Sequence, residues 1–555
     1  MNKVVIIGGQ AAGCKAAARL KRILPDSEIT IVEKREILSF GACGMPFYAS
    51  GDIPELLELA TTPYGMVRDA EFFRDVKGVE ARIHTEATAI DTSAQTVSCR
   101  DLMSGEEFEL GYDNLIIATG GRTSRPPFPC PESERISTFI KPADAKAFRK
   151  KAQTGQVGTA VVIGGGYIGC ELAEALVSLW GIDTHIVEME DRLLPKAFDG
   201  ELAGLIAKVY EDEGVNLHLR TRVEKVELDD DGNPTVSLNS GESIDCDYVF
   251  IATGIMPDTR LARSAGVRIG DRGGIAVDNQ MRTNIANIFA AGDCIEINNY
   301  ITGKPCLLPL GSLANRQGRV AADAIAGRDA NFGGAVGAIS MKAFELITAS
   351  TGLTEKLAGI LGYECSTIVG NWTDRPDYYP ENHDIYAKLV YERETLRLLG
   401  LQLVGRGEVT RYIDSFTQMA AAEGTLYDLL DAEHAYTPPH SGPLNPLNNL
   451  AAMALNQEEG IRCIEPGEID KFEGLVIDVR EESEIEAYPL ERADEKISIK
   501  YFREKASNLD TSRPVLVVCQ RGPRSYEAAR WLNGRGASEV AYLGGGMQLA
   551  EKIIS

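Results

Sequence analysis

The stretch Ala160-Val161-Val162-Ile163-Gly164-Gly165-Gly166-Tyr167-Ile168-Gly169 is the most informative segment of the chain about its fold. An apolar, β-branched run leads directly into a glycine-rich turn, and a helical pattern continues from Gly164 to Leu179. A second apolar run follows at Thr184 to Val187, and Glu188 comes immediately after it. Strand, glycine turn, helix and strand in this order predict a βαβ unit of an α/β protein.

The glycine turn of this unit predicts a dinucleotide site. Its glycines let the backbone approach a pyrophosphate at the helix N-terminus. An acidic residue about 20 residues further on can accept hydrogen bonds from a ribose 2′-hydroxyl and repels a 2′-phosphate. This favours NADH over NADPH, and Arg192 is a poor phosphate ligand because Glu190 and Asp191 flank it. The predicted nucleotide-binding residues are Gly164, Gly166, Tyr167, Ile168, Gly169 and Glu188.

A related pattern opens the chain. The run 3–7, the helical stretch Ala11 to Leu24 and the run Glu28 to Val32 form another βαβ unit. Its fingerprint is degenerate, because Gln10 stands in the position of the middle glycine, but the acidic partner is present. The segments ending in Ala118-Thr119-Gly120 and Ala252-Thr253-Gly254 each close one half of this internal repeat. Two nucleotide sites are therefore predicted, the first with Gly8, Gly13, Glu33, Thr119 and Gly120, the second including Gly254.

The bulk properties exclude several classes of protein. A chain of 555 residues is too long for one core, so several domains are expected. The formal charge of −24 disfavours nucleic acid as a partner, and no run approaches the roughly 20 apolar residues of a membrane helix. The N-terminal apolar run is too short for a signal peptide, so we expect a cytoplasmic protein. The 11 cysteines show neither a Cys-x-x-Cys pair nor zinc spacing, so no metal site is predicted.

The segment Thr283 to Asp293, which ends in Ala290-Ala291-Gly292-Asp293, resembles the second flavin motif of the pyridine nucleotide-disulfide oxidoreductase superfamily. The order of motifs matches that superfamily over roughly the first 325 residues. The resemblance implies FAD at the first site, with Asp293 at the ribityl chain, and NADH at the second. It also implies a helix beginning near Ser312 whose N-terminal dipole favours the anionic reduced flavin.

The segment Ser39-Phe40-Gly41-Ala42-Cys43-Gly44-Met45-Pro46 carries one cysteine where dithiol members of the superfamily carry two. It resembles the single-cysteine branch: coenzyme A disulfide reductases, NADH-dependent persulfide reductases and related NADH oxidases and peroxidases. The resemblance makes Cys43 the redox centre, acting through a mixed disulfide or a sulfenic acid, with Ser39 and Phe40 beside the substrate. The alternative is a structural cysteine. Peroxide chemistry is disfavoured, because Gln10-Ala11-Ala12 lacks the histidine of peroxidase-type relatives.

Lys15, Arg19 and Arg22 lie at i, i+4 and i+7 and predict a cationic stripe on the first helix. A stripe alone is more typical of a solvated face, but the same positions bind coenzyme A phosphates in the family that the chain resembles. The resemblance further implies a homodimer in which two tyrosines of the partner subunit complete the pocket. Tyr378 and Tyr436 are the candidates, whereas interface packing explains Tyr379 equally well.

Near the C-terminus, the buried-strand run Val515 to Val518 leads into Cys519-Gln520-Arg521-Gly522-Pro523-Arg524, and a helix opens at Ser525. Backbone N–H groups, a helix N-terminus and arginines stabilise a thiolate in such a loop. The loop resembles the active-site loop of rhodaneses, which implies a persulfide on Cys519, with Arg521 and Arg524 binding substrate. The usual Gly-His-Ile stretch is replaced by Tyr488 to Arg492, so a catalytically silent rhodanese fold is the alternative.

The predicted fold is α/β: two Rossmann-like dinucleotide-binding domains, an α+β dimerisation domain and a C-terminal α/β rhodanese domain. The predicted boundaries are 1–150 (first segment of the FAD-binding domain), 151–275 (NAD-binding), 276–328 (second segment of the FAD-binding domain), 329–445 (dimerisation), 446–459 (linker) and 460–555 (rhodanese-like). The stretch Tyr436 to Asn456 holds four prolines and five asparagines or serines, which indicates an extended linker. The predicted function is NADH-dependent reduction of coenzyme A persulfide, coenzyme A disulfide or polysulfide. The alternatives are an NADH oxidase or peroxidase, and a sulfur carrier or redox sensor. The order of preference among coenzyme A persulfide, coenzyme A disulfide, glutathione persulfide and polysulfide stays open.

Overall fold

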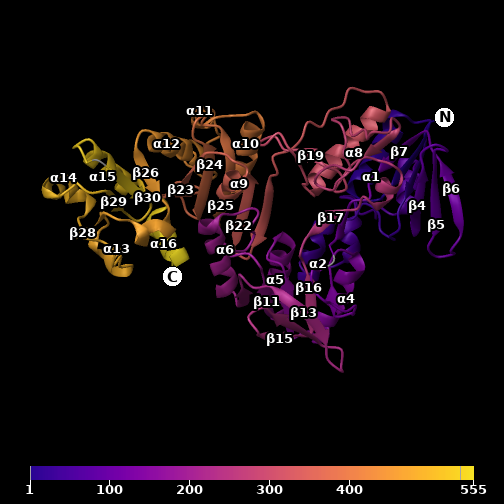
Figure 1. Ribbon diagram of the computed structural model, residues 1–555, viewed down its shortest axis with the longest axis horizontal. Coiled ribbons are helices and arrows are strands. Elements are labelled where there is room, and N and C mark those ends of the chain that lie inside the picture. The colour runs from indigo at the N-terminus through magenta and orange to yellow at the C-terminus, as the bar shows by residue number, and fades with distance from the viewer. Residues whose placement is uncertain (1, 125, 538, 555) are drawn as a thin grey trace. The chain divides into compact units, whose positions relative to one another are not determined.

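The structure is a computed structural model that describes residues 2–124, 126–537 and 539–554. The chain forms two compact units (Figure 1). Unit 1 comprises Met1–Gly164, Ala175–Asp183 and Val223–Ala335, and unit 2 comprises Gly165–Glu174, Thr184–Arg222 and Val336–Ser555. Within the described residues, no helix combines the length and the apolar character that crossing a membrane requires.

A five-stranded parallel sheet is the centre of unit 1. Strand β1 is KVVII, with an exposed lysine followed by four buried apolar residues, which is the pattern of a central strand covered on both faces. Its neighbours β2 and β7 pair with it in parallel. The sheet runs in the order β18 (Ile288–Ala290), β7 (Asn114–Ile117), β1 (Lys3–Ile7), β2 (Glu28–Val32) and β3 (Glu80–Arg82).

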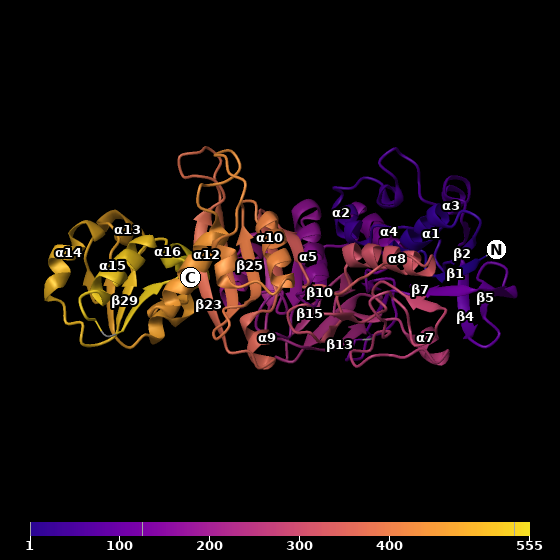
Figure 2. The same cartoon turned by 90° about the horizontal axis from the view of Figure 1, so that it is seen from above.

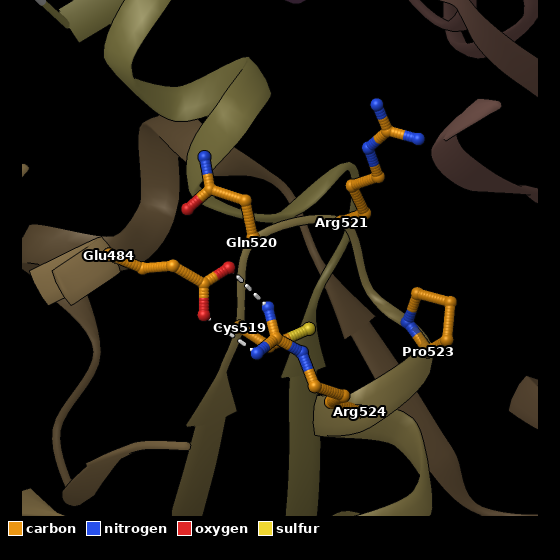
Figure 3. Close-up of a pocket in the computed structure, with 6 residues that line it drawn as sticks. All are labelled: Glu484, Cys519, Gln520, Arg521, Pro523 and Arg524. Atoms are coloured by element: carbon orange, nitrogen blue, oxygen red, sulfur yellow. Dashed lines mark hydrogen bonds and ion pairs between the residues drawn. The ribbon is translucent and has the colours of Figure 1, made fainter. Parts of the chain in front are cut away.

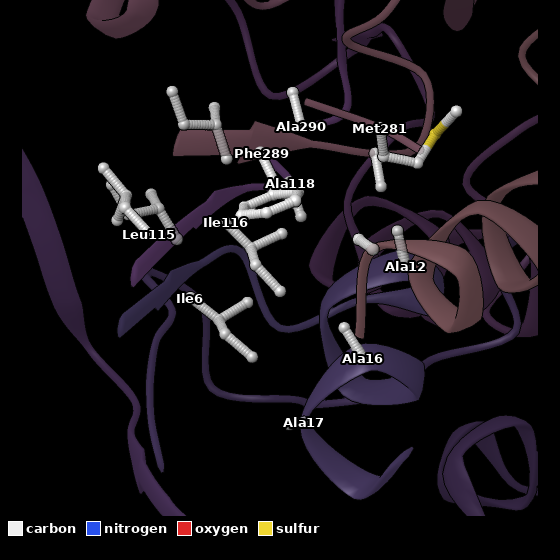
Figure 4. Packing of buried hydrophobic residues seen from close by; sticks show 14 of the residues in the cluster. Ile6, Ala12, Ala16, Ala17, Leu115, Ile116, Ala118, Met281, Phe289 and Ala290 are labelled. Carbon is white, nitrogen blue, oxygen red and sulfur yellow. The ribbon is translucent and has the colours of Figure 1, made fainter. Parts of the chain in front are cut away.

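Two helices, α1 (Ala11–Ile23) and α8 (Gly311–Ile325), pack closely in unit 1. Small side chains make the close approach possible: Ala12, Ala16 and Ala17 are buried in the core shown in Figure 4. At Gly318 of α8 a Cβ atom would stand 2.2 Å from the carbonyl oxygen of Ala12, so only glycine fits there. The helix expected near Ser312 is therefore confirmed, and it lies against the helix that follows the first glycine turn.

The other elements of unit 1 surround this core. Two antiparallel three-stranded sheets, β4-β5-β6 and β13-β14-β15, and the parallel group β10-β16-β9 belong to it. The strands are β4 (Thr85–Asp91), β5 (Thr96–Asp101), β6 (Glu107–Gly111), β8 (Gly121–Thr123), β9 (Ile136–Ser137), β10 (Thr159–Ile163), β13 (Val223–Leu228), β14 (Pro234–Leu238), β15 (Ser243–Asp245), β16 (Tyr248–Ile251), β17 (Ile255–Pro257), β19 (Ile297–Asn298) and β20 (Pro305–Cys306). The helices are η1 (Ala42–Gly44), α2 (Met45–Ser50), η2 (Leu56–Ala60), α3 (Ala70–Lys77), α4 (Pro142–Gln153) and α7 (Arg260–Ser264).

Unit 2 contains a five-stranded antiparallel sheet (Figure 2). Its order is β21 (Ile339–Ala343), β22 (Leu346–Gly352), β25 (Leu398–Gly405), β24 (Asp384–Glu392) and β23 (Cys365–Thr373). The parallel pair β11 (Asp183–Val187) and β12 (Val215–His218) and the helices α6 (Gly200–Asp212), α9 (Glu355–Ile360), α10 (Thr410–Ala421) and α11 (Leu426–Leu430) complete this region. Helices α10 and α11 are separated by a short turn, in which the Gly424 carbonyl accepts a hydrogen bond from the N–H of Leu398 in β25.

The C-terminal residues of unit 2 form a separate parallel sheet. Its order is β26 (Ile461–Ile464), β30 (Val540–Leu543), β29 (Val515–Val518), β27 (Leu475–Asp478) and β28 (Glu495–Lys496). The helices around it are η3 (Pro466–Lys471), α13 (Glu482–Ala487), η4 (Ile499–Tyr501), α14 (Phe502–Lys505), η5 (Ala506–Asn508), α15 (Pro523–Asn533) and α16 (Gly546–Ile554).

The expectation of an extended linker at 446–459 was wrong. Helix α12 (Pro446–Glu458) occupies it, with Leu447 and Leu450 among its buried residues. Proline at the first helical position sacrifices no helical hydrogen bond, and the Asn445 side chain caps the helix by accepting from the N–H of Leu447. Asn445 and Pro446, two of the residues that indicated a linker, thus form the start of a helix.

The predicted α/β class and both βαβ patterns are confirmed. The second pattern is β10, α5 (Tyr167–Trp180) and β11, close to the predicted ranges. The predicted α+β segment before the C-terminal sheet is also present.

Candidate functional site

The first glycine turn is sterically determined. Gly8 has φ +112°, and a Cβ there would stand 2.1 Å from the Ala118 carbonyl oxygen. A Cβ at Gly13 would stand 1.9 Å from the Gly8 oxygen. The buried Glu33 carboxylate accepts from the N–H of Gly9 at 2.7 Å and from the N–H of Arg35 at 2.9 Å. The turn and the acidic residue at the end of β2 are thus one hydrogen-bonded assembly.

The second turn repeats this assembly in unit 2. The Glu188 carboxylate accepts from the N–H of Gly165 at 2.7 Å and from the N–H of Glu190 at 2.8 Å. Cys170 donates its thiol to the Gly165 carbonyl, as Cys14 does to the Gly9 carbonyl. Burial raises the pKa of both thiols far above the ordinary value, so these two cysteines are structural.

The residues present fit FAD at the first turn and a nicotinamide nucleotide at the second. A Cβ at Gly166 would meet no atom within 4 Å, so this side of the turn is open for a pyrophosphate. Burial raises the pKa of Asp293, which follows β18 in the same unit as the first turn. The Thr119 hydroxyl donates to the Asp258 carbonyl at 2.6 Å, so it orders the loop there. Gly120 and Gly254 have φ +67° and +108°.

Cys43 lies in η1 and is exposed. The loop before it is fastened to the first turn: Gln10 donates from Nε2 to the Ile37 carbonyl at 2.9 Å and accepts from the N–H of Phe40 at 3.1 Å. Ser39 donates from its N–H to the Gly9 carbonyl at 2.8 Å. The redox-cysteine candidate therefore stands at the end of a loop that is positioned by the nucleotide turn.

Two residues that position this loop were not singled out from the sequence. Gln10 was interpreted only as a degenerate fingerprint position without a histidine, although a long amide in a turn that prefers glycine is itself a signal. Arg68 donates to the carbonyl and the hydroxyl of Ser39, both at 3.1 Å, so that hydroxyl is already engaged. No sequence signal identifies Arg68. Phe40 is buried.

The predicted cationic stripe on α1 is interrupted. Arg19 pairs with Asp323 of α8 at 2.7 Å, and the two side chains are only 18% and 11% exposed. Lys15 is half-buried and Arg22 is exposed, and neither has an ion-pair partner among the described residues. Two cations, rather than three, are therefore available to an anionic ligand.

Tyr378 and Tyr436 come together in unit 2 although 58 residues separate them, from 378 to 436. A side-chain hydrogen bond with Tyr436 raises the pKa of Tyr378. Tyr378 is 73% exposed and Tyr436 is 49% exposed, so both rings are accessible in the isolated chain. Tyr379 differs, because the Arg375 guanidinium lies over its ring.

The Cys519 loop lies between β29 and α15. The Cys519 sulfur accepts from the N–H of Gly522 at 3.1 Å, and Ser525 Oγ lies 3.3 Å away. Gly522 has φ +117°, which the tight loop requires. A cavity of about 260 Å³ is lined by Glu484, Cys519, Gln520, Arg521, Pro523 and Arg524. Figure 3 shows how these six side chains lie.

Both arginines of this loop are engaged. Arg524 makes a two-pronged ion pair with Glu484, at 2.7 and 2.6 Å. Arg521 points away from Cys519 in Figure 3 and pairs with Asp384 at the start of β24, at 3.1 Å. It also donates to Gln548 Oε1 at 2.8 Å. Glu484 and Gln548 were not predicted, and no local motif signals them.

The comparisons with known proteins agree with this arrangement. The pyridine nucleotide-disulphide oxidoreductase family matches residues 2–318, and the dimerisation domain of that family matches residues 340–446. The NAD(P)H sulfur oxidoreductase (CoA-dependent) of Pyrococcus abyssi is 36% identical over 450 residues, which cover 81% of this chain and 97% of that protein.

Two solved structures extend the similarity to the C-terminal sheet. A NAD-dependent persulfide reductase from A. fulgidus has a TM-score of 0.93 and 38% identity, covering 99% of both chains. Reduced Bacillus anthracis CoADR-RHD has a TM-score of 0.93 and 30% identity, covering 100% of this chain and 98% of that one. This chain belongs to the pyridine nucleotide-disulphide oxidoreductase family and is an oxidoreductase that uses FAD and a nicotinamide nucleotide.

Proposed function

We propose that the protein is an NADH-dependent reductase of coenzyme A persulfide or a related sulfane-sulfur compound. The observation that carries this proposal is Cys43, one exposed thiol on a loop fastened to the first nucleotide turn by Gln10. It is supported by the similarity to the NAD(P)H sulfur oxidoreductase (CoA-dependent) of Pyrococcus abyssi and the NAD-dependent persulfide reductase from A. fulgidus.

The chemistry follows from a single thiol. The Cys43 thiolate attacks the coenzyme A sulfur of the persulfide, the S–S bond of the substrate breaks, and sulfide leaves with the bonding electron pair. A disulfide between Cys43 and coenzyme A remains. Two electrons and a proton reopen it, which restores the thiolate and releases coenzyme A. When bound, FAD supplies this two-electron chemistry, with NADH as the electron source.

We assign substrate binding to accessible cations of α1 and to accessible tyrosine hydroxyls. Lys15 and Arg22 bind the coenzyme A phosphates, because they carry no ion-pair partner among the described residues. In a homodimer, the hydrogen-bonded Tyr378 and Tyr436 of the partner subunit donate to the sulfur leaving group. Support for the dimer comes from the match to the family's dimerisation domain.

The C-terminal sheet and its Cys519 loop are proposed to be a rhodanese-type domain. The geometry around the sulfur, with the Gly522 N–H and Ser525 Oγ close to it, suits a persulfide on Cys519. Cys519 would then relay sulfane sulfur from a donor to coenzyme A, which supplies the substrate of the Cys43 reaction.

The test is the variant Cys43→Ser with coenzyme A persulfide under anaerobic conditions. We expect NADH to bleach the flavin as in the wild-type protein, while sulfide release falls at least about 1,000-fold because no mixed disulfide forms. The control is Cys130→Ser, a half-buried cysteine that donates to the Pro131 carbonyl and should leave both steps unchanged. Sulfide release at the wild-type rate from Cys43→Ser would refute the proposal.

The same experiment under aerobic conditions tests the alternative that the protein is an NADH oxidase. Relatives named NADH oxidase occur in Methanocaldococcus jannaschii and Enterococcus faecalis, at 30% and 28% identity. If NADH-driven oxygen consumption outpaces persulfide reduction at saturating substrate, the protein is an oxidase. The Gln10 side chain argues against this outcome, because it holds the Cys43 loop and offers no acid or base to a sulfenic acid.

A further inference from the structure

The cavity at Cys519 contains two arginines, and carboxylates neutralise both. Arg524 is held by Glu484 through two hydrogen bonds, and the guanidinium of Arg521 is paired with Asp384 and, at 3.5 Å, with Asp377. Glu484 lines the cavity itself. The electrostatic character of the cavity is therefore close to neutral, with a carboxylate exposed to any ligand.

The ion pair lines the same cavity as the reactive sulfur. Cys519 is fully buried, and Figure 3 shows the Glu484 and Arg524 side chains meeting beside the Cys519 side chain. Arg524 lowers the pKa of Glu484, so the carboxylate stays ionised at neutral pH. A ligand that enters the cavity therefore meets this pair next to Cys519.

The other cations near the cavity are also paired with carboxylates. The buried Arg480 is paired with Asp478 at 2.8 Å. Lys500 pairs with Glu481, which directly precedes α13. These cations, like the two arginines of the loop, already face carboxylates, so none of the four is available to balance a second negative charge on a ligand.

We propose that Glu484 makes the Cys519 cavity select persulfide donors, whose reacting end carries one negative charge, over the dianion thiosulfate. This inference rests on the proposed sulfur-relay function of Cys519 and names the substrate class of that site. Thiosulfate would have to separate Arg524 from Glu484 and then bind beside an uncompensated carboxylate. Like charges repel strongly in a partly desolvated site. The repulsion between Glu484 and the dianion therefore weakens the binding of thiosulfate, although thiosulfate is small.

The transfer step is the same for both donors. The Cys519 thiolate attacks the outer sulfur of the donor, the S–S bond of the donor breaks, and a new S–S bond gives the Cys519 persulfide. A persulfide donor releases a thiolate, and thiosulfate would release sulfite. The leaving group takes the electron pair in each case, so no external oxidant or reductant is needed.

The experiment uses the full-length protein carrying Cys43→Ser, so that sulfane sulfur on Cys519 is not consumed by the reductase. Glutathione persulfide and thiosulfate are supplied separately without NADH. Mass spectrometry follows the gain of one sulfur atom on Cys519 with time. We expect labelling by glutathione persulfide to be at least about 10-fold faster than by an equal concentration of thiosulfate.

The decisive variant is Glu484→Gln in the same background. Glutamine keeps a side-chain acceptor for the N–H of Glu481, which Glu484 now caps at the start of α13. It removes the charge and leaves Arg524 free to bind an anion, so labelling by thiosulfate should accelerate about 10-fold while labelling by persulfide changes little. The matched control is Glu486→Gln, an exposed carboxylate on the same helix, which should leave both rates unchanged.

The outcomes distinguish a failure of the proposed selectivity of Glu484 from a failure of the proposed sulfur relay by Cys519. Equal rates with the two donors in the Cys43→Ser protein, or a thiosulfate rate that Glu484→Gln leaves unchanged, would overturn the role of Glu484 while the relay stands. If neither donor labels Cys519 in either protein, the relay itself is wrong and the selectivity fails with it. If thiosulfate labels Cys519 faster in Glu484→Gln but not in Glu486→Gln, the result supports both the selectivity and the relay.

Discussion

Gln10 links the first nucleotide turn to the loop that carries Cys43. Its amide donates to the Ile37 carbonyl and accepts from the N–H of Phe40. Each bond contributes about 1 kcal/mol when both partners are present. Loss of both leaves the turn intact but lets the loop move relative to it, so the residue affects the position of the Cys43 sulfur rather than its chemistry.

The variant Gln10→Ala should therefore lower kcat/KM for coenzyme A persulfide about 10-fold without loss of bound flavin. Stopped-flow reduction of the flavin by NADH should proceed at the wild-type rate, because the loop does not form the nicotinamide site. Gln156→Ala, at an exposed position in the same unit, is the control. A normal kcat/KM in Gln10→Ala would mean that the loop is held by Arg68 and Ser39 alone.

Glu188 is the residue that we predict to discriminate between NADH and NADPH. Its buried carboxylate is oriented by the N–H groups of Gly165 and Glu190, so a negative charge is held at the end of β11. A 2′-phosphate would meet that charge. We expect kcat/KM for NADH to exceed that for NADPH at least about 10-fold in the wild-type protein, and Glu188→Gln to narrow the ratio. Steady-state kinetics with both nucleotides measure it, and an unchanged ratio in the variant would assign the discrimination elsewhere.

At the scale of elements, the strand-turn-helix unit depends on glycines that no other residue can replace. Gly8 combines a positive φ with the Ala118 carbonyl only 2.1 Å from the position of a Cβ. An added methyl group would displace β7 from β1 at the point where the pyrophosphate should bind. This makes the element intolerant of substitution, whereas glycines at surface turns are not constrained by packing.

We predict that Gly8→Ala yields protein with less than about a tenth of the wild-type flavin content, because the strained turn no longer presents its N–H groups to a pyrophosphate. Absorbance of purified protein gives the flavin-to-protein ratio. Gly111→Ala is the control, since a Cβ at the end of β6 meets no atom within 4 Å. Full flavin content in Gly8→Ala would contradict the assignment of the first turn to FAD.

At the scale of the whole molecule, the C-terminal sheet is joined to the antiparallel sheet of unit 2 by a buried charge cluster. Lys388 of β24 is fully buried and lies 3.0 Å from Glu201 of α6, 2.7 Å from Glu355 of α9 and 2.8 Å from Glu465. Glu465 immediately precedes η3 of the C-terminal sheet. Three carboxylates around one ammonium leave excess negative charge in a buried place, which is unfavourable unless a proton is retained.

The pH dependence of stability follows from this excess. Burial and the hydrogen bond with Glu201 raise the pKa of Glu465 to about 8, well above the value of an exposed carboxyl group. Because the folded pKa is the higher one, the stabilisation is complete below the ordinary carboxyl pKa and is lost as pH rises toward and through 8. Between about pH 6 and about pH 9, the midpoint temperature of the first thermal unfolding transition of the wild-type protein should fall by a few degrees.

Glu465→Gln keeps a hydrogen-bonding side chain but cannot ionise, so its first transition should fall less over the same pH range. Glu473→Gln, at an exposed position in the same domain, should behave like the wild-type protein. Identical pH profiles for Glu465→Gln and the wild type would show that the titration of Glu465 does not cause the pH dependence of the first transition.

How much could be predicted from the sequence depended on the range of the interaction. The two βαβ units, the glycine positions and the cysteine at position 43 are local patterns, and the structure contains the predicted elements. The pairing of Tyr378 with Tyr436 was reached through a family resemblance, not through spacing. The segment 446–459 was misinterpreted because a proline at a helix start and a proline in a linker look alike in the sequence. The burial of Leu447 and Leu450 distinguishes the two.

The amino-acid sequence was therefore sufficient for the α/β fold class, because glycine turns and strand-helix periodicity act over a few neighbouring residues. The chemistry-bearing residues that it nominates stay predictions. Which charges are available became clear only from the folded chain. Arg19 is neutralised by Asp323, which lies 304 residues away, and Arg524 is neutralised by Glu484, 40 residues before it. Ion pairing depends on which distant elements pack together, and no local pattern in this chain encodes those two contacts.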